Sequence, residues 1–221
     1  MNKNNLVGCN NIKNDLLLYL PNLFEIIGTE DDFGWNKIDS LYNKIKQKRI
    51  DLYGGQTIDI SPTIFDRINA AKENDPIAIL QLNIINDIFL DLSSSLNDHE
   101  KQLLKSNIKN ILKSDNNNWR NFFGEIAVIN NILQTNLYEL IGIEKRSNGK
   151  PIDFLIKEKY TGEISIVEVV SIHLDTKKVE SNIESIKKFI TYRINQKFNS
   201  KTCEDSKSNF YLIPILWGDT K

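Results

Sequence analysis

The sequence predicts a mixed protein of the α+β or α/β class, with a helical N-terminal region and a core ordered helix, three strands, helix, strand around a mixed sheet. Apolar residues recur at helical spacing through most of residues 1–115. Short apolar runs typical of strands follow after residue 137, and a polar run at residues 115–118 separates the two parts. We therefore expect a helical region over residues 1–115 and an αβββαβ domain over residues 116–221.

The helices of the N-terminal region follow from apolar periodicity and from start signals. Their expected ranges are 11–27, 35–52, 61–71, 77–92 and 97–112. Ser61-Pro62 and Asp75-Pro76 each have the form of an N-cap followed by proline at the first helical position. Asn97, with Glu100 three residues later, is typical of a capping box.

The second part of the chain changes character. Its expected elements are a helix over 119–134, strands over 138–143, 152–156 and 164–172, a helix over 177–198, and a strand over 210–216. Ser147-Asn148-Gly149-Lys150 and Tyr160-Thr161-Gly162 have the composition of turns between these strands. This order predicts the αβββαβ core.

Composition favours an ordinary globular chain of the cytoplasm. Of the 221 residues, 40% are hydrophobic and 26% are charged. No uninterrupted apolar run reaches the length of a membrane helix, and the N-terminus lacks a secretory signal pattern. Cys9 and Cys203 lie far apart and form no metal-type spacing, so we expect free thiols in a reducing compartment and no membrane partner.

Positive charge is concentrated near the C-terminal helix. Residues 119–221 carry 15 Lys/Arg and 13 Asp/Glu, whereas residues 1–118 carry 13 and 16. The basic residues of this stretch are Lys177, Lys178, Lys187, Lys188, Arg193, Lys197 and Lys201. Such a stripe can neutralise the phosphates of a nucleic acid, but a solvated helix face has the same composition.

Three acidic residues stand out against this pattern. Glu125 lies inside the helix over 119–134, Asp153 lies at the start of the second strand, and Glu168 lies within the third. A carboxylate among apolar neighbours costs several kcal/mol unless it is paired, protonated or bound to a metal. Acids on neighbouring strands can converge, and their hard oxygen atoms suit Mg²⁺ or Mn²⁺.

This order of acids and elements resembles the PD-(D/E)XK, or restriction-endonuclease-like, nuclease superfamily over residues 119–218. The resemblance implies that Asp153, Glu168 and the Val169 carbonyl hold Mg²⁺ or Mn²⁺, with Glu125 assisting through water. It also implies a metal-dependent endonuclease that hydrolyses phosphodiester bonds, with DNA as the first expectation and RNA left open.

The sequence departs from the family pattern at two places. Pro151 precedes Asp153 by two positions instead of one, and Val170 stands where the family has lysine. Some members of the family supply the basic group from the following helix, which makes Lys197 the first candidate and Arg193 the second. Lys197 continues the expected inward stripe of that helix, although both residues are equally compatible with surface charges. The stripe consists of Ile183, Ile186, Ile190 and Ile194.

Two further expectations concern binding. The residues expected to contact a nucleic-acid backbone are Lys177, Lys178, Lys187, Lys188 and Lys201. The alternative function is a catalytically inactive nuclease-fold module that serves binding or assembly in a defence or toxin system. In a third interpretation the helical N-terminal region is the functional part, and in any of them this region can hold a partner protein or a second copy in a homodimer.

Overall fold

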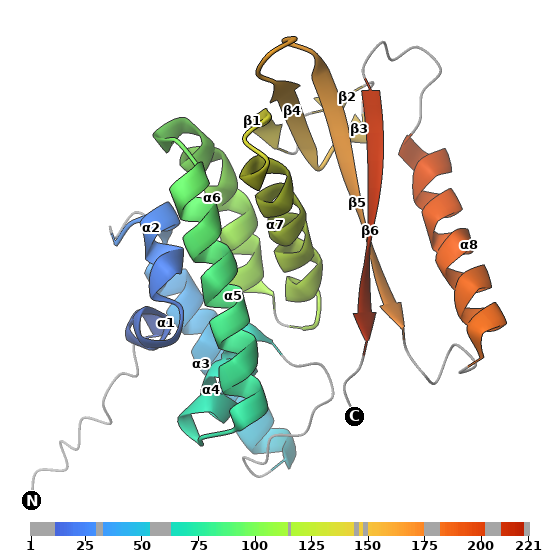
Figure 1. Cartoon of the computed structure of the whole chain (residues 1–221). Helices are drawn as coiled ribbons and strands as arrows, with labels where there is room; N and C mark the ends of the chain where they lie inside the picture. Colours follow the sequence, from blue (N-terminus) through green and yellow to red (C-terminus); the bar gives the residue numbers. More distant parts are fainter. Residues whose placement is uncertain are drawn as a thin grey trace, which may run out of the picture. The chain divides into compact units, whose positions relative to one another are not determined.

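The computed structural model shows a mixed α+β protein in which a helical N-terminal region precedes a four-stranded mixed sheet (Figure 1). The structure describes residues 12–29, 33–53, 63–114, 116–143, 146–147, 150–174, 182–201 and 209–218. The chain forms two compact units. The first unit contains Met1–Ser94 and Leu104–Phe122, and the second contains Ser95–Leu103 and Phe123–Lys221.

The helices of the first unit confirm the helical character expected of the N-terminal region. They are α1 (Ile12–Tyr19), η1 (Pro21–Leu23), α2 (Phe24–Ile27), α3 (Trp35–Tyr53), α4 (Ile64–Lys72), α5 (Pro76–Ser95) and the later part of α6 (Asp98–Lys113). The single helix expected over 11–27 is wrong, because the chain breaks at Pro21. Leu20 leaves the helical region with φ −136° and ψ 55°, as expected for a residue that precedes proline.

Two of the expected helix starts are confirmed in atomic detail. Asp75 Oδ1 accepts the backbone N–H groups of Ile77 and Ala78, at 2.8 Å and 3.1 Å. Asn97 Oδ1 accepts the N–H of Glu100 at 3.0 Å, while Glu100 Oε2 accepts the N–H of Asn97 at 2.9 Å. These reciprocal bonds form the capping box that the sequence predicted.

The start of α4 differs from the expected one. Ser61 and Pro62 lie outside the described residues, and the helix begins at Ile64 with Thr63 as its N-cap. The Thr63 hydroxyl accepts the N–H of Asp66, and the Asp66 carboxylate accepts the N–H of Thr63. Asp66 sits at the third helical position, so a capping box starts this helix two residues after the expected cap.

Helix α5 is apolar on more than one side. In the described part of the chain it is the one helix that is long and apolar enough to cross a membrane. It has 20 residues, and its mean hydropathy is 1.3. Its buried residues are Ala78, Leu82, Ile85, Phe89 and Leu92. Asn86 also accepts two hydrogen bonds from Asn22 of η1, one at its side-chain oxygen and one at its backbone carbonyl. The helix thus has one buried stripe, while only 28% of its apolar window is buried.

The sheet of the second unit has the order β1-β4-β5-β6. Its strands are β1 (Tyr138–Ile143), β4 (Phe154–Glu158), β5 (Ile164–Leu174) and β6 (Asn209–Gly218), and a separate small ribbon pairs β2 (Arg146–Ser147) with β3 (Lys150–Pro151). The pairs β1/β4 and β4/β5 are antiparallel, and β5/β6 is parallel. All four expected strands are present, although β4 begins at Phe154, so Asp153 directly precedes the strand.

Two helices cover opposite faces of this sheet, α7 (Trp119–Gln134) and α8 (Ile183–Lys201) (Figure 1). On the α7 side, a Cβ added to Gly124 would meet Ile215 at 2.9 Å and Ser171 at 3.5 Å, so glycine permits this close packing. On the α8 side, Phe198 packs edge-on against Phe210 with ring centroids 6.2 Å apart. Because side chains alternate along a strand, the even-numbered residues of β5 face α8.

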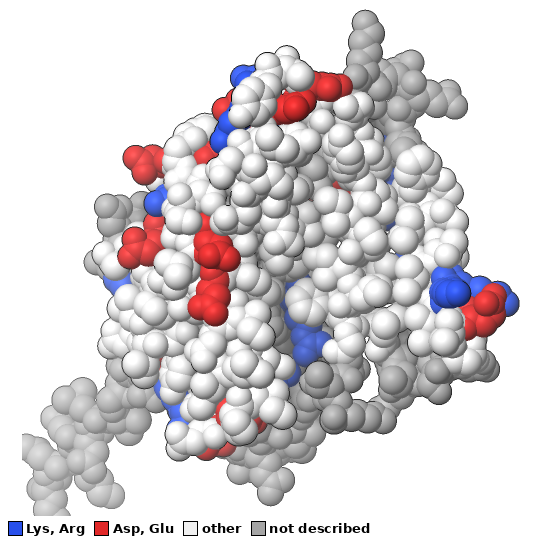
Figure 2. Space-filling view, viewed as in Figure 1, with Lys and Arg blue, Asp and Glu red and all other residues white. Residues whose placement is uncertain are grey.

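Helix α8 covers its side of the sheet incompletely. None of the described residues on this helix is fully buried, and the expected inward stripe is wrong at Ile183, which is 73% exposed. Ile186, Ile190 and Ile194 are half-buried. Lys188 and Glu184 of this helix are exposed and form an ion pair of 3.7 Å. Basic and acidic groups lie side by side at the right-hand edge of Figure 2.

Candidate functional site

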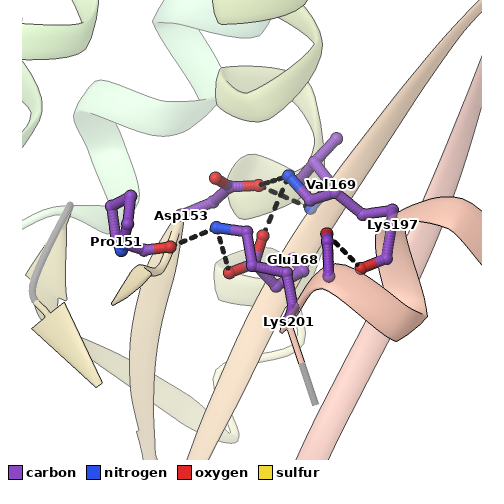
Figure 3. A network of polar contacts seen from close by, with 7 residues as sticks. Pro151, Asp153, Glu168, Val169, Lys197 and Lys201 are labelled. Atoms are coloured by element: carbon purple, nitrogen blue, oxygen red, sulfur yellow. Dashed lines mark hydrogen bonds and ion pairs between the residues drawn. The ribbon is translucent and has the colours of Figure 1, made fainter. Parts of the chain in front are cut away.

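The pairing of β4 with β5 brings Asp153 and Glu168 together. In the antiparallel register Phe154 lies opposite Val167, so Asp153, one residue earlier, lies beside Glu168, one residue later. Asp153 Oδ2 accepts a hydrogen bond of 2.7 Å from the backbone N–H of Val169 (Figure 3). Of the three acids expected to converge, Glu125, Asp153 and Glu168, the structure brings Asp153 and Glu168 together.

Glu168 is the most buried charged group of the site. Its exposed fraction is 0%, and its buried neighbours on the same face of β5, Ile166 and Val170, are apolar. Glu168 Oε2 lies 2.9 Å from Lys197 Nζ, and Glu168 Oε1 lies 3.1 Å from Lys201 Nζ. Each oxygen of this buried carboxylate therefore has one ammonium group as its ion-pair partner.

Both lysines bridge Glu168 to the segment that carries Asp153. Lys197 Nζ lies 3.4 Å from Asp153 Oδ2, and Lys201 Nζ donates to the backbone carbonyl of Pro151 (Figure 3). The two lysines are four residues apart on α8, so they lie on one face of the helix. Two carboxylates and two ammonium groups therefore form one network of balanced formal charge.

The pKa values of this network shift because of burial and of charge. Burial raises the pKa of the Glu168 carboxyl and the negative charge of Asp153 raises it further, while Lys197 and Lys201 only partly offset this. Burial acts to lower the pKa of Lys197, but the carboxylates of Asp153 and Glu168 outweigh it and leave that pKa raised. A raised pKa favours the neutral form of Glu168 but the charged form of Lys197. Because two acids act on Lys197, its side chain is an ammonium at neutral pH.

The raised pKa of Glu168 predicts a pH dependence of stability in the metal-free protein. As pH rises above the ordinary value of 4.5, the unfolded chain loses this proton before the folded protein does. The free energy of unfolding should therefore fall from pH 4.5 until Glu168 ionises in the folded state. Glu168→Gln should lack this fall and be at least as stable as the wild type at neutral pH.

Chemical denaturation between pH 4 and pH 8 in the presence of a chelator measures this difference. Glu163→Gln is the matched control, because Glu163 is exposed directly before β5, and it should keep the wild-type dependence. Suppose that Glu168→Gln unfolds more easily at neutral pH and that its free energy of unfolding changes with pH as in the wild type. Burial of the ionised Glu168 carboxylate then does not destabilise the protein.

The structure separates the other candidates from this network. Among the described residues no three His, Cys, Asp or Glu side chains are grouped closely enough to hold a metal ion, so Glu125 does not join Asp153 and Glu168 directly. Glu125 is half-buried on α7, which lies on the face of the sheet opposite α8. Arg193 is exposed and donates to Gln196 Oε1 at 3.1 Å, whereas Lys197 reaches both acids.

The residues expected to contact a nucleic-acid backbone do not all lie on one exposed surface among the described residues. Lys177 and Lys178 lie outside the described residues, and Lys187 and Lys188 are exposed on α8. Lys201 instead belongs to the acid network, with a side chain that is only 14% exposed. Sequence reasoning missed this role, although the four-residue spacing from Lys197 was a signal that both point the same way.

No family model, no curated protein and no solved structure matches this chain. The chemistry proposed for the site therefore depends on the placement of its own residues. The proposal rests on the two adjacent carboxylates, the complete burial of Glu168 and the lysine between the acids.

Proposed function

We propose that Asp153 and Glu168 bind a divalent cation and that the protein is a metal-dependent hydrolase. Within that class we propose a nuclease that hydrolyses phosphodiester bonds, with DNA as the first substrate to test. The observation that carries the proposal is the convergence of two carboxylates from adjacent strand positions, with a lysine ammonium within 3.4 Å of both. The order of helix, three strands, helix and strand supports the resemblance to the PD-(D/E)XK nucleases.

The residues present fit a hard divalent cation. Mg²⁺ prefers oxygen ligands and keeps several of its waters, so one or two carboxylates are enough to hold it. Glu168 is fully buried, and its two oxygens contact lysine ammonium groups whose positive charge a cation can replace. Asp153 is fixed by the N–H of Val169 and keeps its second oxygen, Oδ1, for a ligand. The Val169 carbonyl remains a proposed ligand, whereas Glu125, on the opposite face of the sheet, is left out of the proposed site.

A divalent cation bound here would lower the pKa of a bound water and offset negative charge on the phosphate. The chain supplies the surrounding electrostatics. Lys197 remains positively charged beside both carboxylates, so we assign it the stabilisation of developing negative charge rather than the removal of a proton. Val170 shares the α8 face of β5 with Glu168 and is apolar, so in this proposal the lysine comes from the helix and not from the strand.

We expect nucleic-acid binding to be directed at the backbone and to weaken with salt. Lys187 and Lys188 are exposed on α8 and offer charge without a group that reads base edges. Reversal of both to Glu should weaken binding by a similar factor for unrelated sequences and should reduce the salt dependence. Fluorescence anisotropy with two unrelated oligonucleotides at increasing salt measures this. Affinity that is insensitive to salt, or a loss confined to one sequence, would contradict the assignment.

A non-catalytic nuclease-fold module is the second candidate, and one observation favours it. The two carboxylates are already neutralised by two lysines, and among the described residues no third His, Cys, Asp or Glu side chain lies with them. Such a network can simply be a structural ion-pair cluster.

Incubation with plasmid, linear DNA, single-stranded DNA and RNA separates the candidates, with Mg²⁺ or Mn²⁺ present or withheld by a chelator. The nuclease proposal expects metal-dependent cleavage of at least one substrate. If all four substrates remain intact with folded protein and either metal, the non-catalytic module is the better account.

A further inference from the structure

The ammonium of Lys201 contacts two oxygen atoms. Its Nζ lies 3.1 Å from Glu168 Oε1 and also donates to the backbone carbonyl of Pro151. A carboxylate oxygen and a backbone carbonyl are ligand types that hard divalent cations also use. Lys201 therefore stands at an oxygen of Glu168 that a bound cation could take.

The charges of the metal-free network balance, so an added cation must disturb the existing ion pairs. Without metal, two carboxylates face two ammonium groups. A divalent cation would add two positive charges beside a residue that is 0% exposed, and uncompensated charge is costly there. Repulsion between the incoming cation and the ammonium groups must then weaken at least one of the existing ion pairs.

The contacts identify which lysine is the easier one to release. Lys197 faces both carboxylates, at 2.9 Å from Glu168 and 3.4 Å from Asp153. Lys201 faces one carboxylate and one neutral carbonyl, so a smaller electrostatic attraction holds it. Lys201 is also the last residue of α8, and its long flexible stem can carry the ammonium away from the acids.

We propose that Lys201 is an exchangeable counter-ion, which neutralises Glu168 in the metal-free protein and turns to a phosphate of the nucleic acid when a divalent cation binds. This inference rests on the proposed metal site. In the metal-bound state, and only there, Lys201 makes the contact to the nucleic-acid backbone that the sequence predicted. It also predicts that metal and nucleic acid assist one another, because binding coupling is reciprocal.

Titration with Mn²⁺ alone, followed by calorimetry, tests the competition. Removal of the positive charge in Lys201→Met should tighten Mn²⁺ binding by about tenfold or more, because a like charge no longer opposes the cation. Lys201→Gln keeps a hydrogen-bond donor for Pro151 without the charge, and it should show the same direction if the methionine variant folds poorly. Lys159→Met removes a charge from the exposed turn after β4 and should leave Mn²⁺ affinity unchanged.

A second arm measures the coupling with a short phosphorothioate DNA. Mn²⁺ should strengthen binding of this DNA to the wild type more than to Lys201→Gln. Equal strengthening in both proteins would remove Lys201 from the phosphate contact.

The outcomes distinguish this inference from the metal site itself. If the wild type binds Mn²⁺ and both Lys201 variants bind it more weakly, Lys201 is a positioning residue for the segment at Pro151 and the exchange is wrong. Unchanged affinity in both variants also overturns the exchange. If neither the wild type nor a folded Lys201 variant binds Mn²⁺, the proposed metal site fails and the inference fails with it.

Discussion

Asp153→Asn and Glu168→Gln are each expected to lower metal-dependent cleavage by roughly a hundredfold or more. A metal ion supplies several kcal/mol of transition-state stabilisation, and each 1.4 kcal/mol corresponds to about tenfold in rate. Each substitution removes one of the two carboxylates that converge at the site. Initial rates of plasmid nicking at saturating Mn²⁺ measure the loss.

Both variants are expected to remain folded, which separates a chemical effect from a structural one. Asn at position 153 keeps an acceptor for the Val169 N–H, and Gln at 168 avoids the cost of burying a charge. Glu163→Gln serves as the control, with wild-type cleavage expected. Wild-type rates in both Asp153→Asn and Glu168→Gln would rule out these acids as the catalytic metal site.

Lys197→Met is expected to lower cleavage at least tenfold while metal binding is retained. Lys197 Nζ is the ammonium that lies within 3.4 Å of both carboxylates, and the loss of one electrostatic contact to the transition state has an effect of about this size or larger. Val170→Lys in the same variant should partly restore the rate, because residue 170 faces the same side of β5 as Glu168. Single-turnover cleavage rates, with Mn²⁺ affinity measured in parallel, provide the comparison.

Arg193→Met is the matched control for the relocated lysine. Arg193 lies on the same helix but is exposed and bonded to Gln196, so its removal should cost less than the removal of Lys197. Normal cleavage by folded Lys197→Met would show that this lysine has no part in the reaction. A larger loss in Arg193→Met would assign the role to the arginine instead.

The elements were predictable wherever local chemistry determines them. The helix over 119–134 and the strand over 138–143 have the expected bounds, and the Asn97–Glu100 capping box is confirmed. Alternation along β5 was enough to place Glu168 and Val170 on one face. The interruption at Pro21 was visible in the sequence as well, but apolar periodicity on both sides of the proline concealed it.

The details of the site were less predictable, because they depend on packing between distant segments. The pair Asp153–Glu168 follows from strand order and register, and Lys197 follows from the face of α8. Lys201 was expected to contact a nucleic-acid backbone, because it lies beyond the expected end of the helix at residue 198. Only the approach of Pro151 and Glu168 places it in the network. Ile183 shows the converse error, since an apolar residue in the first turn of α8 is 73% exposed.

Mn²⁺ titration of the wild type and of Asp153→Asn by calorimetry tests the central claim most directly, namely that the two carboxylates form a divalent-cation site. We expect saturable binding of one ion by the metal-free wild type, and binding to Asp153→Asn that is weaker by about tenfold or more. Glu163→Gln should bind as the wild type does. The absence of binding to folded wild-type protein, or equal affinity in Asp153→Asn, would contradict the account.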